Sequence, residues 1–331
     1  MEPTDEASAF STLGPGEVLD AVESLGYRCD GRLLALNSYE NRVYQVGIEG
    51  AEPLVGKFYR PGRWTDAAIL EEHDFSRELE AQEIPLVAPL DDADGRSLHR
   101  HGPFRFALYP RRGGRVPDLE DPQLLEQMGR LVARIHNVGA LRPFRQRPAL
   151  TVEAFGEEAF HYLLEQGFIP PQLQQAYRSL AEDLVARIRG CFARAGAPTS
   201  LRLHGDCHPG NILTTGSVLH IVDLDDARMG PAVQDLWMFL SGDRAHMTAR
   251  LADVLEGYTR FREFDPRELH LLEALRTLRM MHYAAWLARR WDDPAFPRAF
   301  PYFNTERYWG EHILSLREQA ALMDEPPLTW D

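Results

Sequence analysis

The chain has 331 residues, of which 44% are hydrophobic and 26% charged, proportions that suit a globular protein with an ample core. Its formal net charge of −14 argues against a nucleic-acid backbone or an anionic membrane as the main partner, because both are negatively charged. Three cysteines without CxxC spacing indicate a reducing compartment. Residues 1–6 are acidic and no apolar run is long enough to span a membrane, so we expect a cytoplasmic protein without a secretory signal.

Residues 1–110 predict a small lobe rich in antiparallel strands. Alternating polarity between turn residues predicts four strands: 42–48, 54–59, 84–90 and 104–109. Helical spacing of apolar residues predicts two helices: 16–25, which Gly26 ends, and 65–83, which Thr65 starts.

Three polar residues of this lobe suit a nucleotide. Lys57 lies inside the second strand of a hairpin, where a lysine can equally be an exposed edge charge. Glu72 falls on the apolar stripe of the 65–83 helix, and we expect it to pair with Lys57 because an unpaired buried carboxylate is costly. The alternative places Glu72 at the edge of the stripe, in water. The polar loop 37–41, which includes Ser38, lacks a glycine-rich motif but offers donors for phosphates, although such clusters are usually turns.

Residues 111–331 predict a larger, mainly helical lobe, so that the fold class is α+β. Caps, prolines and helical spacing predict four helices: 121–135, 171–196, one that begins over 234–240, and one from Asp265 towards Arg290. The tail that follows is rich in proline and aromatic residues, and we expect it to pack.

The stretch 203–226 carries the chemistry. Asp206 lies in a polar elbow between apolar strands, Asn211 follows five residues later, and Asp223 follows twelve residues after that. This spacing matches the catalytic loop and the metal-binding aspartate of kinases. We therefore expect Asp206 to orient an acceptor hydroxyl and take its proton. Asn211 and Asp223 would hold Mg²⁺ on the phosphates of ATP, with Asp206 and Asp223 as the catalytic carboxylates, and Asp225 would ligate a second ion or brace the site.

Several alternatives compete for these residues. Taken singly, Asp206 is a turn residue and Asp223 a strand-end acid. His204 and His208 have the spacing of a zinc pair, but the glycines and the proline around them disfavour the helix that such a pair needs. We expect His204 to brace the loop by a hydrogen bond to backbone, and Cys207 to be a small buried side chain, with redox sensitivity as the alternative. Asp235 would accept backbone N–H groups from the loop.

These motifs are similar to those of a known family. HGDxHxGNIL at 204–213 with VDLD at 222–225 resembles the aminoglycoside phosphotransferase and choline kinase family, a branch of the protein-kinase-like fold. Four further motifs narrow the resemblance to a bacterial serine/threonine protein kinase of this family: LNSYENRVYQ at 36–45, KFYRP at 57–61, GPAVQDLWM at 230–238 and WDDPAFP at 291–297. Gly56 and Pro209 depart from the expected pattern, but neither removes a functional group.

The resemblance implies a bilobal fold and an ATP- and Mg²⁺-dependent kinase that acts on Ser and Thr hydroxyls of proteins, its own chain included. It implies a cytoplasmic monomer that protects stressed cells from death. Carried over by motif, Asp206 is the proton acceptor, Asn211 and Asp223 bind Mg²⁺, and Ser38 lies at the ATP site. Two alternatives remain: a small-molecule kinase acting on an amino alcohol, aminoglycoside, choline or homoserine, and a catalytically dead nucleotide-binding regulator.

Overall fold

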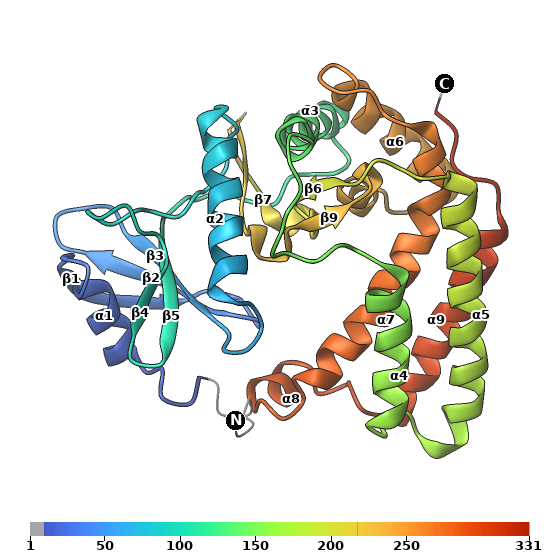
Figure 1. Cartoon of the computed structure of the whole chain (residues 1–331), viewed down its shortest axis with the longest axis horizontal. Helices are drawn as coiled ribbons and strands as arrows, with labels where there is room; N and C mark the ends of the chain where they lie inside the picture. Colours follow the sequence, from blue (N-terminus) through green and yellow to red (C-terminus); the bar gives the residue numbers. More distant parts are fainter. Residues whose placement is uncertain (1–9, 217, 331) are drawn as a thin grey trace. The chain divides into compact units, whose positions relative to one another are not determined.

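The computed structural model describes residues 10–216 and 218–330, so the expectation for the acidic N-terminal segment lies outside the described residues. Packing divides the chain into two units, which are described separately (Figure 1). The first unit takes the described residues up to Val116 together with 212–225 and 292–295. The second takes 117–211, 226–291 and the described residues from Phe296 onwards. Within the described residues, none of the helices has the length and apolar character of a membrane span.

The first unit is built on a five-stranded antiparallel sheet in the order β1-β2-β3-β5-β4. Its strands are β1 (Cys29–Ala35), β2 (Arg42–Ile48), β3 (Leu54–Tyr59), β4 (His99–His101) and β5 (Phe104–Pro110). The bounds of β2 and β3 agree with the predicted strands. The strand predicted over 84–90 is wrong, because only Leu86 forms a bridge, with Ile221. Pro85 and Pro89 lack the N–H groups that a ladder needs.

Two helices pack on opposite faces of this sheet: α1 (Pro15–Glu23) and α2 (Asp66–Ala81). Phe58 of β3 belongs to the buried cluster that contains α1, whereas the next residue, Tyr59, packs with Ile69 of α2. Successive strand residues face opposite sides, so Lys57 shares the α2 face with Tyr59. The side chain of Thr65 accepts the backbone N–H of Ala68 at 3.1 Å, which confirms the predicted start of α2.

A later hairpin belongs to the same unit. It consists of β7 (Ile212–Thr215) and β8 (Val218–Ile221), joined antiparallel. Its edges bond to segments near the sheet: Ile221 accepts the N–H of Val87 at 3.1 Å, and Thr214 exchanges two backbone hydrogen bonds with Arg115. The hairpin leads into a 3₁₀ turn, Leu224–Asp226, so the stretch that contains Asp223 is part of the sheet unit.

The second unit is mainly helical. Its helices are α3 (Pro122–Gly139), α4 (Glu158–Glu165) after a π-helical turn (Glu153–Glu157), α5 (Pro171–Ala195), α6 (Arg244–Tyr258), α7 (Leu272–Arg289), α8 (Ala295–Ala299) and α9 (Glu306–Asp324). Helices α4, α5, α7 and α9 lie side by side (Figure 1). Helices α3 and α6 can approach closely because Gly129 has no side chain. A Cβ at this position would lie 2.0 Å from the carbonyl oxygen of Val254. The short strands β6 (Leu201–Leu203) and β9 (Arg228–Gly230) pair antiparallel.

Two predictions for this unit need correction. The helix expected to begin over 234–240 does not form, because two 3₁₀ turns, Ala232–Asp235 and Trp237–Phe239, occupy this segment. The carboxylate of Asp235 there binds backbone groups of another segment. The helix predicted from Asp265 starts with a 3₁₀ segment, Pro266–Leu271, before α7. Phe296, Phe303 and Trp309 are fully buried, which confirms that the aromatic tail packs.

Candidate active site

The loop 204–211 of the second unit is held in place by Asp235. One carboxylate oxygen of Asp235 accepts the backbone N–H of His204 at 2.8 Å, and the other accepts that of Gly205 at 2.9 Å. His136 of α3 contacts the same carboxylate at 3.1 Å. Burial acts to raise the pKa of Asp235, but the hydrogen bond to His136 and the charges nearby lower it overall. The expectation that Asp235 accepts backbone N–H groups of this loop is confirmed.

Glycine is required in this loop at position 205. Gly205 has φ +85°, in the left-handed region, and a Cβ there would lie 2.2 Å from the carbonyl oxygen of Asp226. Any other residue would therefore have to move the backbone that carries the next residue, Asp206.

The backbone and side chain of Asp206 are both engaged within the second unit. Its carbonyl oxygen accepts the backbone N–H of His208 at 2.8 Å and the side-chain amide of Asn211 at 3.0 Å. One carboxylate oxygen contacts the guanidinium of Arg279 on α7, and the other lies 3.6 Å from Nε2 of His208. The side chain is 21% exposed, so a hydroxyl can reach it. Because the Asn211 amide nitrogen is engaged, its amide oxygen is the atom suited to a hard cation.

The neighbouring residues of the loop have structural roles. His204 is fully buried and its Nδ1 accepts the backbone N–H of Asp206 at 3.3 Å, which confirms the predicted brace. Cys207 is also fully buried, and burial raises its pKa well above the ordinary thiol value. It is thus a small buried side chain that stays protonated. His204 and His208 do not lie on one α-helix, so the geometry of a helical zinc pair is not formed.

In the first unit, Lys57 forms ion pairs with two acidic residues that follow β8. Its Nζ lies 2.8 Å from a carboxylate oxygen of Asp223 and 3.2 Å from one of Asp225. The second oxygen of Asp225 lies 2.6 Å from Arg63. Burial acts to lower the pKa of Lys57, but Asp223, Asp225 and Glu72 raise it well above the ordinary lysine value. Lys57 therefore stays charged at neutral pH, as a phosphate-binding lysine must.

The other predicted nucleotide residues lie in the same unit. Glu72 is buried on α2 and is one of the carboxylates that raise the pKa of Lys57; a direct Lys57–Glu72 pair stays a prediction. Ser38 is half-buried in the loop between β1 and β2, and its contact with ATP also stays a prediction.

Asp223 adopts an uncommon backbone conformation. Its φ is +62°, in the left-handed region that residues other than glycine rarely adopt. Such a conformation costs on the order of 1 kcal/mol, and residues held in it cluster at functional sites. The carboxylate is 49% exposed although Lys57 pairs with it. Strain and exposure together fit a carboxylate that is kept for a ligand.

The oxygen donors fit Mg²⁺ better than other metals. Mg²⁺ prefers carboxylate and amide oxygens and keeps several ligands from water and phosphate, so it needs few protein donors. The exposed carboxylate of Asp223, in the first unit, and the amide oxygen of Asn211, in the second, are donors of this kind. Asp225 is only 5% exposed and is shared by Lys57 and Arg63, an arrangement that favours the bracing role predicted for it. Within the described residues, no cluster of three or more His, Cys, Asp or Glu could hold a metal by itself.

Three residues of the site were not predicted from the sequence. Arg63 contacts Asp225, Arg279 contacts Asp206, and His136 contacts Asp235. No local motif marks Arg63 or His136. Arg279 has one signal, since it lies in a helix that carries several arginines and only one acid.

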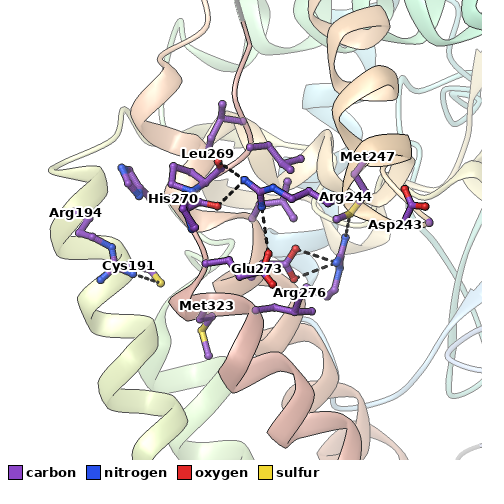
Figure 2. A pocket seen from close by; sticks show the side chains of 17 residues that line it. Cys191, Arg194, Asp243, Arg244, Met247, Leu269, His270, Glu273, Arg276 and Met323 are labelled. Carbon is purple, nitrogen blue, oxygen red and sulfur yellow. Dashed lines mark hydrogen bonds and ion pairs between the residues drawn. The ribbon is translucent and has the colours of Figure 1, made fainter.

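A cavity of about 270 Å³ lies elsewhere in the second unit (Figure 2). Arg244 donates to the carbonyl oxygens of Pro326 at 2.8 Å and Pro327 at 2.7 Å. Glu273 and Arg276 pair at 3.0 Å across its wall. Arg244 thus holds the C-terminal segment, and none of the predicted site residues lines the cavity.

The fold and these donor sets define a phosphotransferase with a kinase-like fold, and comparison with known proteins agrees. Residues 32–272 match the phosphotransferase enzyme family, APH. The chain therefore belongs to this family.

The chain is also similar to individual named proteins over almost its whole length. The chain is 43% identical to "Stress response kinase A" of Escherichia coli (strain K12), over 98% of each chain. It is 42% identical to "Serine/threonine protein kinase RdoA" of Salmonella typhimurium (strain LT2), again over 98% of each. These relatives confirm the narrower resemblance that the four further motifs predict. A solved structure of amicoumacin kinase hAmiN in complex with AMP-PNP, Ca²⁺ and Ami has a TM-score of 0.73 at 19% identity, covering 96% of this chain and 95% of the other. It confirms the kinase-like α+β fold.

Proposed function

We propose that this phosphotransferase is a serine/threonine protein kinase of the bacterial stress response. It would transfer the γ-phosphate of Mg²⁺-ATP to protein hydroxyls and protect stressed cells from death. The observation that supports the transfer chemistry is the accessible carboxylate of Asp206. It lies on a loop that is fixed by backbone hydrogen bonds to Asp235. Support for a protein acceptor comes from the names of the relatives, which match this chain over 98% of its length.

Each residue has a defined part in the transfer. The acceptor oxygen forms a bond to the γ-phosphorus, the bond from that phosphorus to the β–γ bridging oxygen breaks, and ADP leaves with the electron pair. Asp206 orients the hydroxyl and receives its proton late, because the transition state is loose and positioning dominates. Lys57 would hold the phosphates, and Asn211 and Asp223 would hold Mg²⁺. When bound, Mg²⁺ supplies positive charge that neutralises the phosphate oxygens.

We also propose where the enzyme acts and in what form. We place it in the cytoplasm, where ATP is available and where the free thiols of Cys29, Cys191 and Cys207 stay reduced. We also propose that it acts as a monomer on protein substrates, its own chain among them, and on neither nucleic acid nor membrane.

A second candidate is a small-molecule phosphotransferase. The likeness in fold to amicoumacin kinase hAmiN favours it, and such an enzyme would use the same catalytic groups. Incubation of the full chain with γ-labelled ATP and Mg²⁺, with and without added proteins, separates the two. Label on the chain itself or on an added protein supports the protein kinase. Transfer only to amino alcohols or aminoglycosides, with no label on any protein, contradicts it.

A further inference from the structure

One face of α7 is cationic and aromatic. Arg279, Tyr283, Trp286 and Arg290 follow one another at spacings of four, three and four residues, which places them on the same side of a helix. From residue 274 to residue 291 the chain has four arginines and no aspartate or glutamate. This composition is unusual in a chain whose net charge is −14, and it concentrates positive charge along one helix.

Contacts arrange this face as a preformed surface. The rings of Tyr283 and Trp286 stack with centroids 5.5 Å apart and planes 17° from parallel. The guanidinium of Arg290 lies 5.1 Å from the centre of the Trp286 ring. Trp286 is fixed from another side by the buried Phe296, at 5.1 Å. Tyr283 remains 40% exposed. Tyrosine, tryptophan and arginine are the residue types that dominate protein recognition surfaces.

The first residue of this face, Arg279, lies beside the proposed catalytic residue, Asp206. Arg279 contacts the carboxylate of Asp206 and its side chain is 41% exposed. A guanidinium carries five N–H donors in a fork that matches carboxylates and phosphates. Any group attached next to the acceptor hydroxyl, which Asp206 must face, therefore meets a cation. Part of the guanidinium is paired with Asp206, and its remaining N–H donors suit a carboxylate or a phosphate and offer no acceptor to an amine.

Two acids of the second unit are paired with arginines outside α7. Asp226 pairs with Arg228 at 2.6 Å, and Glu157 pairs with Arg189 at 2.8 Å. Burial, followed by the positive charge of Arg228, lowers the pKa of the α7 residue His282 to about 3. His282 is therefore neutral at neutral pH, and the positive charge of α7 comes from its arginines.

We propose that the acceptor of this enzyme is an acidic peptide segment, in which aspartate, glutamate or phosphorylated side chains flank the serine or threonine. The α7 face from Arg279 to Arg290 binds this segment, and Arg279 determines specificity at the position next to the hydroxyl. This inference rests on the proposed protein-kinase function and adds the class of substrate to it. It also distinguishes the enzyme from a kinase for cationic amino alcohols or aminoglycosides.

The test uses the full chain with Mg²⁺-ATP and two serine peptides of equal length, one flanked by Asp and Glu, the other by Lys and Arg. We expect kcat/KM to be at least about tenfold higher for the acidic peptide. Arg279→Ala should raise KM for that peptide about tenfold, Arg279→Lys should restore part of the loss, and Arg279→Glu should reverse the preference. Arg307→Ala removes an arginine that is 87% exposed on α9 and serves as the matched control for net charge.

A binding measurement accompanies the kinetics. Fluorescence anisotropy of the labelled acidic peptide, without ATP, should show weaker binding to Arg279→Ala and to Arg290→Ala than to the wild type or to Arg307→Ala. Equal use of both peptides, or preference for the basic one, overturns the acidic-substrate inference and leaves the protein-kinase proposal standing. Absence of label on every peptide and protein, the enzyme included, overturns the proposed function itself. In that case the anisotropy still decides whether α7 binds acidic peptides.

Discussion

Lys57 and Asp223 form an ion pair of 2.8 Å although 166 residues separate them in the chain. The pair forms because the hairpin β7–β8, which leads to Asp223, packs within the sheet unit, where Ile221 bridges to Leu86. The lysine expected to bind phosphates and the carboxylate expected to bind Mg²⁺ are thus brought together within one unit. The pair also keeps Lys57 charged although it is buried.

Replacing this lysine should weaken nucleotide binding. Lys57→Met keeps the apolar stem but removes the charge that would bind phosphate, so we expect KM for ATP to rise at least about tenfold, the loss of one charge-assisted hydrogen bond. The buried Asp225 also loses a partner, which should lower the free energy of unfolding by about 3 kcal/mol. Steady-state kinetics and urea denaturation measure the two effects. Arg32→Met, at an exposed pair with Asp30, should change neither; an unaltered KM in Lys57→Met would remove the phosphate role.

The hydrogen bonds that fix the loop 204–211 to Asp235, called the brace here, should be needed for turnover. Asp235→Asn leaves one carbonyl oxygen to serve the N–H groups of His204 and Gly205, so one buried donor loses its partner. We expect the free energy of unfolding to fall by about 1–3 kcal/mol and kcat to fall about 10²-fold, because the loop that carries Asp206 shifts. Asp324→Asn, at an exposed acid, is the control. If kcat fell no further in Asp235→Asn than in this control, the loop would not depend on the brace.

Stability should depend on pH through a buried glutamate. Glu268 accepts the backbone N–H of Val233 at 2.8 Å, and burial raises its pKa from 4.5 to about 7. The folded state thus binds this proton more tightly than the unfolded state. The resulting stability is fully present below pH 4.5 and is lost as pH rises through about 7, a loss of about 3 kcal/mol.

Denaturation at pH 5 and pH 8 checks this. In Glu268→Gln the amide oxygen still accepts the N–H of Val233 but has no proton to lose, so this part of the pH dependence should vanish. Glu52→Gln, at an exposed position, should retain it. An equal slope in wild type and Glu268→Gln would show that another group is responsible.

Local patterns predicted the elements that depend on local chemistry. Strands β2 and β3 alternate in polarity around a turn and were predicted with their observed bounds. The capping residues Thr65 and Asp121 correctly marked the starts of α2 and α3. The roles of Asp235 and His204 were also predicted, because the acid-amide-acid spacing identified the loop that they hold.

Other features depend on contacts between distant segments, which local patterns do not encode. Strand β1 is mostly exposed, so it lacks the alternation of a half-buried strand. A boundary at residue 110 does not anticipate that 212–225 joins the first unit. The positive φ of Asp223 has no signature, since aspartate is common in ordinary turns. Arg279 lies 73 residues from Asp206, and only the helix packing of the second unit brings them together.

The most direct test of the proposed mechanism is turnover of Asp206→Ala, measured as transfer of label from γ-labelled ATP to protein, with ATP binding measured in parallel. We expect turnover to fall by about 10²–10⁴-fold while ATP still binds, because Asp206 is proposed to act on the acceptor hydroxyl and Lys57, in the other unit, is proposed to hold the phosphates. Unchanged turnover in Asp206→Ala would contradict the assignment of this residue and, with it, the proposed mechanism.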